Sequence, residues 1–278
     1  MKDIRIAVVQ MCSVVGDTKG NLASIERYVR EACARDVDIL CFPELSISGY
    51  NAGDTSNPVP ESLVGESTSQ LAELGRETGL TFFAGILERS NSGTVYNTQV
   101  IFGPDGIQGC YRKSHVPTTE METWAQGDDL PVFDHPKARY GIQICYDSHF
   151  PEVSTALAEL GAEIIFMPHA SGGETAAKKK ERWLRYVPAR AYDNTVYLAI
   201  CNQVGDNKAN NVFAGVSFIC DPYGKVIADI QNAGKEEMII TDLSSEVFDE
   251  SRRVPESFFR HFRRPEIYDQ WMKGNSNR

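Results

Sequence analysis

The chain has 278 residues, of which 42% are hydrophobic and 24% are charged, and its formal net charge is −10. This composition is typical of a water-soluble globular protein and argues against a fibrous or disordered chain. The negative charge argues against a surface that binds nucleic acid or an anionic membrane, because both require clustered positive charge. No segment rich in proline, glycine or serine divides the chain, so we predict one domain over residues 1–278.

The cellular location is predicted from what the sequence does not contain. The N-terminal residues lack the apolar core and the small-residue cleavage site of a signal peptide, and no segment reaches the roughly 20 apolar residues that span a bilayer. The seven cysteines form no C-x-x-C pair, which favours reduced thiols over a disulfide framework. We therefore expect a cytoplasmic protein whose cysteines lie mostly in the core.

Apolar, β-branched segments alternate with amphipathic segments along the chain, which is the pattern of sheets covered by helices. A strand at 4–10 and a strand at 38–42 enclose a helix at 18–34, whose apolar residues recur on one face. Turn sequences at 104–106 and 221–224 predict antiparallel hairpins, so the sheets should be mixed. Further strands are predicted at 81–89, 95–102, 107–112, 140–146, 163–167, 196–202, 213–220 and 225–230, and helices near 61–78, 151–160 and 174–193.

Two segments of the chain are similar to each other, 38–44 and 163–169. Each follows an amphipathic helix and ends an apolar strand with proline and a polar residue, Glu44 in the first and His169 in the second. Two explanations stay open at this point, chance similarity and a fold with two equivalent halves, each made of a sheet and its covering helices.

The segment 245–278 is rich in charged and aromatic side chains, among them Phe258, Phe259, Phe262 and Tyr268. Such a composition is unusual for a free end and predicts that the segment packs on a surface. We expect this C-terminal extension to dock either on its own domain or across a homodimer interface, since two-fold dimers are the commonest soluble oligomers. The expected assembly is a homodimer or a higher homo-oligomer.

Cys145 is the first candidate for chemistry, because it closes a predicted strand and precedes the helix start Phe150-Pro151-Glu152. A thiol at a strand-to-helix turn lies near backbone N–H groups that favour its thiolate and can bind an oxyanion. A nucleophilic cysteine also needs a base, and the carbonyl that it attacks needs a positive partner. Glu44, at the end of an apolar strand, and Lys113, directly after the strand 107–112, are the candidates.

Taken together, these motifs resemble those of the nitrilase (carbon–nitrogen hydrolase) superfamily. Phe42-Pro43-Glu44, Tyr111-Arg112-Lys113 and Cys145-Tyr146-Asp147 occur in the family's order and at its spacing. The resemblance extends over nearly the whole chain, including Gly49-Tyr50, Arg190-Ala191, Asn194 and Asn202. It implies an α/β fold, an α-β-β-α four-layer sandwich with two mixed sheets covered by helices, and a catalytic triad of Glu44, Lys113 and Cys145.

The resemblance also implies a second glutamate in the loop after the lysine. The segment Pro117-Thr118-Thr119-Glu120, followed by Trp124 and Gly127, is similar to that loop. Glu120 is therefore predicted to be the fourth catalytic residue, with Glu122 as the alternative.

The implied reaction is hydrolysis of a non-peptide C–N bond in a small amide, which gives a carboxylic acid and ammonia through a thioester on Cys145. Tyr146-Asp147 occupies the place where nitrile-cleaving members carry Trp-Glu, so an amide is favoured over a nitrile. An N-carbamoyl (ureido) substrate would use the same triad and stays open as an alternative. No cofactor is expected, since the sequence contains neither His/Cys spacing that would hold a metal nor a glycine-rich nucleotide motif.

Two further classes of function stay open, a catalytically silent binding protein of the same fold and a papain-like enzyme in which His149 or His169 activates Cys145. Lys178-Lys179-Lys180, with Arg182 and Arg185, would either attract a substrate carboxylate or form a solvated helix face. The predicted partner is a small amide or carbamoyl compound. The candidate substrate-binding residues, from the loops that should form the pocket, are Tyr50, Trp124, Tyr146, His149 and His169.

Overall fold

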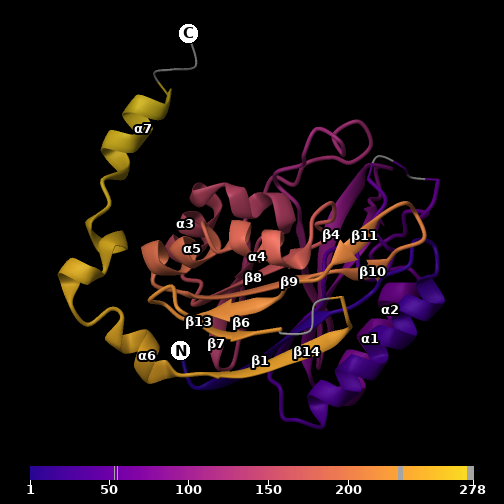
Figure 1. Ribbon diagram of the computed structural model, residues 1–278, viewed down its shortest axis with the longest axis horizontal. Helices are drawn as coiled ribbons and strands as arrows, with labels where there is room; N and C mark the ends of the chain where they lie inside the picture. Colours follow the sequence, from indigo (N-terminus) through magenta and orange to yellow (C-terminus); the bar gives the residue numbers. More distant parts are fainter. Residues whose placement is uncertain (53, 55, 231–233, 274–278) are drawn as a thin grey trace.

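The computed structural model describes residues 1–52, 54, 56–230 and 234–273, and within them it contains two large sheets and one small one (Figure 1). The first sheet has the strand order β14 (Glu237–Leu243), β1 (Ile4–Gln10), β2 (Ile39–Cys41), β3 (Thr81–Arg89), β4 (Val95–Gly103) and β5 (Gly106–Arg112). The second has the order β13 (Val226–Asp229), β12 (Phe218–Cys220), β9 (Tyr197–Asn202), β8 (Ile164–His169), β7 (Ala138–Ile142) and β6 (Val132–His135). The small sheet pairs β10 (Val204–Asp206) with β11 (Val212–Ala214).

The two large sheets stack face to face, with a helical layer on each outer side (Figure 1). Aromatic side chains join the sheets, since Phe83 of β3 lies 4.8 Å from Phe166 of β8 and 5.5 Å from Tyr140 of β7 between ring centroids. Each buried aromatic side chain contributes roughly 1.5–3 kcal/mol through the hydrophobic effect. The helices α1 (Thr18–Cys33) and α2 (Glu66–Thr78) cover the first sheet, and α3 (Pro151–Glu159), α4 (Ala176–Trp183) and α5 (Val187–Asn194) cover the second. The predicted α-β-β-α sandwich with mixed sheets is confirmed.

The centre of each sheet is a set of three parallel strands, β1-β2-β3 in one and β7-β8-β9 in the other. The middle strands are β2 and β8, which are the two segments with similar sequences. Glu44 follows β2, and His169 ends β8. The backbone N–H of Ala170 donates to Glu44 Oε2 at 2.7 Å, so the carboxyl ends of the two middle strands meet directly. The topology therefore places the two similar segments at equivalent positions.

Three predicted elements are wrong in their bounds, each for a local reason. The strand predicted at 213–220 is split into β11 and β12, because Gly215 and Val216 have positive φ values of 81° and 82°. The helix predicted at 174–193 is split into α4 and α5, since Tyr186 leaves the helical conformation and Pro188 lies in the first turn of the second helix. The strand predicted at 140–146 ends at Ile142, and a short 3₁₀ helix covers Cys145–His149.

Other differences concern segments with weak periodicity. The helix predicted at 61–78 begins only at Glu66, after the extended residue Gly65. The short strands β6 and β10 and the edge strand β14 were not predicted. Among the described residues, none of the helices combines the length and the apolar character that crossing a bilayer requires.

The C-terminal segment divides into a docked part and an exposed part. Helix α6 (Ser245–Glu250) packs on its own chain, where Phe248 is buried and the Tyr197 hydroxyl donates to the Ser244 carbonyl at 2.9 Å. Two 3₁₀ turns follow, Pro255–Ser257 and Phe259–Phe262, and the second packs on its own chain, where Arg260 donates to the Ala158 carbonyl and the Phe259 ring lies 5.5 Å from Tyr192 between centroids. Helix α7 (Pro265–Lys273) then stands away from the body of the molecule (Figure 1). Residues 274–278 of the predicted extension lie outside the described residues.

Gly85 of β3 provides a test of how the segment after β2 is held. A Cβ atom at this position would lie 2.2 Å from the backbone nitrogen of Leu45, so Gly85→Ala must displace the residue next to Glu44. We expect the free energy of unfolding to fall by about 3 kcal/mol, the upper end for overpacking. Urea unfolding followed by circular dichroism measures it. Gly93→Ala is the control, because a Cβ there meets no described atom within 4 Å and costs only the left-handed backbone, about 1 kcal/mol. Equal losses in the two variants would contradict the close approach.

Candidate active site

Glu44 is fully buried at the carboxyl end of β2, and its carboxylate accepts three hydrogen bonds. Lys113 Nζ and Asn97 Nδ2 each donate to Oε1 at 2.8 Å, and the Ala170 N–H donates to Oε2 at 2.7 Å. The Gln203 side chain holds the Glu44 carbonyl at 2.8 Å. A buried carboxylate with this many donors is kept in one orientation, which suits a group that must receive and return a proton at a fixed place.

Lys113 follows β5 and is almost completely buried, with 1% of its surface exposed. Its ammonium donates to Glu44 Oε1 at 2.8 Å and to Glu120 Oε2 at 2.9 Å. Burial by itself would lower the pKa of Lys113, but the nearby Glu44, Cys145 and Glu120 raise the pKa above its ordinary value. Lys113 therefore remains charged and supplies a fixed positive charge inside the site.

Asn97 of β4 contacts both Glu44 and Lys113. Its side-chain amide donates to Glu44, and its backbone carbonyl accepts from the Lys113 N–H at 2.9 Å. The side-chain oxygen of Asn97 is buried and has no hydrogen-bond partner among the described residues. The sequence reasoning missed Asn97, because an asparagine within an alternating strand carries no signal that its side chain turns inward.

Glu120 is the second buried carboxylate, and the alternative Glu122 is exposed. The Tyr50 hydroxyl donates to Glu120 Oε1 at 2.6 Å, and Lys113 donates to both oxygens. Burial raises the pKa of Glu120, with Lys113 acting in the opposite direction. The Trp124 ring packs edge-on against Tyr50, with the ring centroids 5.7 Å apart, and its buried N–H has no partner in the described part of the chain.

Cys145 begins the 3₁₀ helix Cys145–His149 and has a positive φ of 45°, a conformation that costs energy for a residue with a side chain. The side chain is partly buried, and its thiol interacts electrostatically with the carboxylates of Glu44 and Glu120. Burial raises the pKa of the Cys145 thiol well above its ordinary value, Glu44 adds to this rise, and Lys113 and the Ala170 N–H oppose it. The resting group is therefore a thiol that needs a base.

The two histidines near Cys145 are placed differently. His169 is buried, with Nδ1 2.8 Å from the Met167 carbonyl oxygen and Nε2 3.4 Å from Ser148 Oγ, and burial lowers its pKa to about 3. His149 is exposed and packs against Tyr186 with ring centroids 4.9 Å apart. Neither ring has a hydrogen bond to Cys145 within the described residues, which argues against a Cys–His pair.

The basic residues of the segment 178–185 are mostly paired with carboxylates. Lys180 pairs with Asp229, Arg182 with Glu174 and Arg185 with Glu181. Lys179 turns inward, where it donates to Ser171 Oγ at 2.8 Å and to the Gly172 carbonyl at 3.2 Å, and its ammonium lies 3.8 Å from Glu174 Oε2. The basic segment 178–185 therefore offers little unpaired positive charge to a substrate. Lys179 holds the loop that follows β8.

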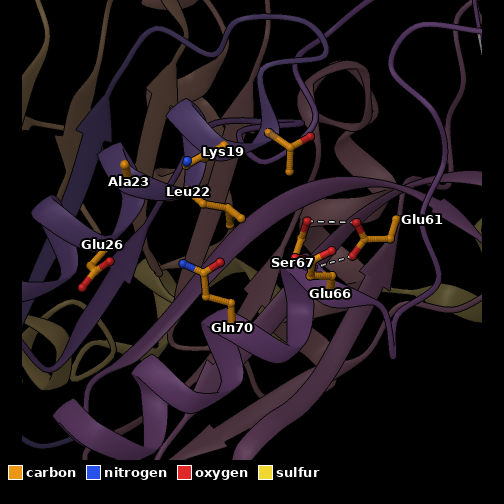
Figure 2. Close-up of a pocket in the computed structure, with 9 residues that line it drawn as sticks. Lys19, Leu22, Ala23, Glu26, Glu61, Glu66, Ser67 and Gln70 are labelled. Atoms are coloured by element: carbon orange, nitrogen blue, oxygen red, sulfur yellow. Dashed lines mark hydrogen bonds between the residues drawn. The ribbon is translucent and has the colours of Figure 1, made fainter.

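A surface cavity between α1 and α2 contains none of the candidate residues (Figure 2). Its carboxylates are Glu26, Glu61 and Glu66. Glu61 accepts from the Ser67 N–H at 2.8 Å and from Ser67 Oγ at 2.9 Å, so it caps the N-terminal turn of α2. We interpret this cavity as structural. Among the described residues, no group of three or more His, Cys, Asp or Glu side chains could hold a metal ion.

Comparisons with known proteins point to one family. The model of the family described as carbon–nitrogen hydrolase matches residues 5–253. The chain is 33% identical to the omega-amidase NIT2 of Xenopus tropicalis, over 99% of this chain and 100% of that protein. It is 32% identical to an (R)-stereoselective amidase of Pseudomonas sp, over 84% of this chain and 82% of that protein.

Solved structures share the fold. A mutant of the amidase from Nesterenkonia sp. AN1 in complex with butyramide superimposes with a TM-score of 0.84 at 22% identity, over 96% of this chain and 97% of that chain. Saccharomyces cerevisiae Nit3, a member of branch 10 of the nitrilase superfamily, superimposes with a TM-score of 0.78 at 26% identity, over 91% of this chain and 94% of that chain.

Replacing Lys113 by methionine tests the buried ion cluster. Glu44 and Glu120 would lose their shared cation, and breaking such a buried pair costs about 3–5 kcal/mol. Lys113 lowers the pKa of Glu120, so without the ammonium that pKa should rise further, and the folded variant then binds a proton that the unfolded chain does not. We expect its stability to increase as the pH falls from about 8 to about 5.5.

Urea unfolding at the two pH values measures this effect. Lys137→Met is the matched control, because Lys137 pairs with Asp38 at 2.8 Å near the surface and should cost about 1 kcal/mol or less. A Lys113→Met variant that is more stable at the higher pH would contradict the assignment of charge.

Proposed function

The chain belongs to the carbon–nitrogen hydrolase family and is an amide hydrolase that works through a cysteine, and we propose that this cysteine is Cys145. We further propose that its substrate is a small primary amide. We assign Glu44 as the general base and acid, Lys113 as the group that stabilises the oxyanion, and Glu120 as the carboxylate that orients Lys113. The observation that carries this proposal is the Lys113 ammonium, buried between Glu44 and Glu120 and electrostatically coupled to Cys145.

In the first half of the proposed reaction, Glu44 takes the thiol proton while the Cys145 sulfur attacks the amide carbonyl carbon. The tetrahedral oxyanion is held by Lys113 Nζ and by the Tyr146 N–H, which lies at the start of a helix where backbone N–H groups have no intrahelical partner. The C–N bond then breaks, and Glu44 returns its proton to the leaving nitrogen. Ammonia and a thioester on Cys145 result.

In the second half, Glu44 removes a proton from a water molecule that attacks the thioester carbonyl carbon. The C–S bond breaks, the carboxylic acid leaves, and the sulfur regains a proton from Glu44. Glu120, held by Tyr50, keeps the Lys113 ammonium directed at the reacting oxygen. The same carboxyl group thus acts as base and acid in both halves.

The substrate class is supported by the relatives, which are named for amide hydrolysis. An N-carbamoyl substrate would use the same residues and stays the alternative. The pairing of the basic residues of the segment 178–185 with carboxylates gives no support to an acid-bearing substrate. A catalytically silent protein would have no need to keep two carboxylates and an ammonium buried together, since burying such charges costs stability.

A substrate screen tests the proposal. Butyramide, a dicarboxylic acid monoamide, an N-carbamoyl amino acid and butyronitrile should be compared by ammonia release, with Cys145→Ala in parallel. We expect release from the amides and none from the Cys145→Ala variant. Mass spectrometry of acid-quenched enzyme should find the acyl group on Cys145. No turnover of any compound would favour the silent protein, and an acyl group on Cys41 or Cys201 would overturn the nucleophile.

The variant Glu44→Gln tests two roles of Glu44, its action as a base and the effect of its charge on the Cys145 thiol. Loss of the base should lower amide turnover by about 10²–10⁴-fold. Because Glu44 raises the pKa of the Cys145 thiol, its replacement should lower that pKa and accelerate alkylation by iodoacetamide at pH 8. Rates of alkylation between pH 6 and pH 10 measure the shift. Glu122→Gln, which changes an exposed carboxylate of the neighbouring loop, should leave both properties unchanged. Slower alkylation in Glu44→Gln would contradict this role of the charge.

We also propose that residues 254–273 form an arm that packs on a second copy of the chain. The arm exposes aromatic side chains, with Phe259 43%, Phe262 57% and Tyr268 40% exposed, and aromatic residues are enriched at subunit interfaces. The family model ends at residue 253, where the arm begins. Truncation after Arg253 should convert a homodimer or larger assembly into a smaller species by light scattering. An unchanged mass would assign the assembly to another surface.

A further inference from the structure

Asp147 is a fully buried carboxylate that the proposed reaction does not use. Its Oδ2 accepts from the Ile144 N–H at 2.9 Å and from the Tyr111 hydroxyl at 2.8 Å. Its Oδ1 accepts from Ser114 Oγ at 2.9 Å and from the His115 N–H at 2.8 Å, with His115 Nδ1 at 3.1 Å. One carboxylate therefore joins the turn around Cys145 to the chain that directly follows Lys113.

The pattern of donors explains why the residue is an aspartate. The N–H groups of Ile144 and His115 can only donate, and each points at a different oxygen of Asp147. An asparagine has one oxygen and one NH₂ group, so it would place a donor against one of these two N–H groups. A buried donor left unpaired in this way costs about 1–3 kcal/mol. A carboxyl group, with an acceptor oxygen on each side, satisfies both sides of the link.

The link holds a strained turn. Cys145 has a φ of 45°, and its backbone is fixed by hydrogen bonds on either side, from the Ser148 hydroxyl to the Cys145 carbonyl at 2.7 Å and from the Asp147 N–H to the Ile144 carbonyl at 3.0 Å. Strained residues persist where their surroundings determine the conformation. The Asp147 carboxylate adds a bond to Ile144, the residue before the nucleophile, and connects it to Ser114 and His115.

We propose that Asp147 is a positioning residue that fixes the Cys145 sulfur relative to the Lys113 ammonium, through the Ile144 N–H on one side and the Ser114-His115 backbone on the other. This inference rests on the proposed function, because it concerns the approach of the nucleophile to the carbonyl whose oxygen Lys113 holds. Asp147 does not touch the substrate or transfer a proton. It determines whether the sulfur can reach the carbonyl carbon while Lys113 binds the oxygen of the same carbonyl group.

The test is Asp147→Asn, which keeps the side-chain shape and breaks one half of the link. We expect kcat for the best amide to fall about 100-fold, the cost of a displacement near 1 Å, with KM changed little. Alkylation of Cys145 by iodoacetamide should slow at every pH, and this readout needs no turnover. A variant that loses stability but keeps the kcat and the alkylation rate of the wild type would overturn the proposal.

Two further variants keep the test decisive if Asp147→Asn folds poorly. Asp221→Ala is the control, since Asp221 is also a buried carboxylate that accepts from two backbone N–H groups, those of Tyr223 and Lys225, but it lies in the turn after β12 and not beside Cys145 or Lys113. It should lose stability and keep kcat. Ser114→Ala removes only one donor on the Lys113 side and should lower kcat by a smaller factor.

The double variant Ser114→Ala with Asp147→Asn completes a cycle. If the residues act through one link, the double variant should lose no more kcat than Asp147→Asn alone, whereas independent effects would multiply and contradict the link. Failure of the proposed function is distinguishable, because then the wild type turns over no amide while alkylation of Cys145 still responds to Asp147.

Discussion

The arrangement of the site depends on one ion, the Lys113 ammonium, which is held between Glu44 and Glu120 with almost no contact with water. Moving a charged group into the interior costs several kcal/mol even after relaxation. Two carboxylates share this one ammonium, so the cluster carries an excess of acceptor oxygens. Asn97 and the Ala170 N–H donate hydrogen bonds to the Glu44 oxygens, and the Tyr50 hydroxyl donates to Glu120. These donors come from β4, from the loop after β8 and from the loop after β2, so the cluster joins three separate parts of the chain.

The two halves of the fold meet at this cluster. Glu44 follows the middle strand of the first sheet, and Ala170 follows the middle strand of the second, so their hydrogen bond joins equivalent points. Side chains at the carboxyl ends of parallel strands gather at one edge of a sheet, and two stacked sheets bring two such edges together. Cys145 comes from the second half, and Glu44 and Lys113 come from the first. Neither half contains the whole site.

Much of this could be predicted from the sequence, because it depends on local signals. The places of Glu44 and Lys113 follow from apolar runs that stop at a polar residue, and the sandwich follows from the order of strands and helices, whereas the strand before Cys145 ends earlier than predicted, at Ile142. The contacts of Asn97, Asp147 and Ala170 could not be predicted, because they depend on register and on a backbone N–H. The sequence likewise made His169 a candidate for substrate contact, whereas both of its nitrogens face partners within the chain.

The protonation state of Cys145 determines how such a site can work. A cysteine beside an imidazolium ion reacts from a preformed thiolate, whereas burial and Glu44 raise the pKa of the Cys145 thiol and so favour the protonated sulfur. In the proposed reaction the thiolate forms only as the sulfur attacks, and the proton that Glu44 receives is available for the leaving nitrogen. An amide nitrogen leaves poorly unless it is protonated, so the same arrangement suits amides. A resting thiol is also less open to oxidation than a thiolate, which protects the nucleophile between turnovers.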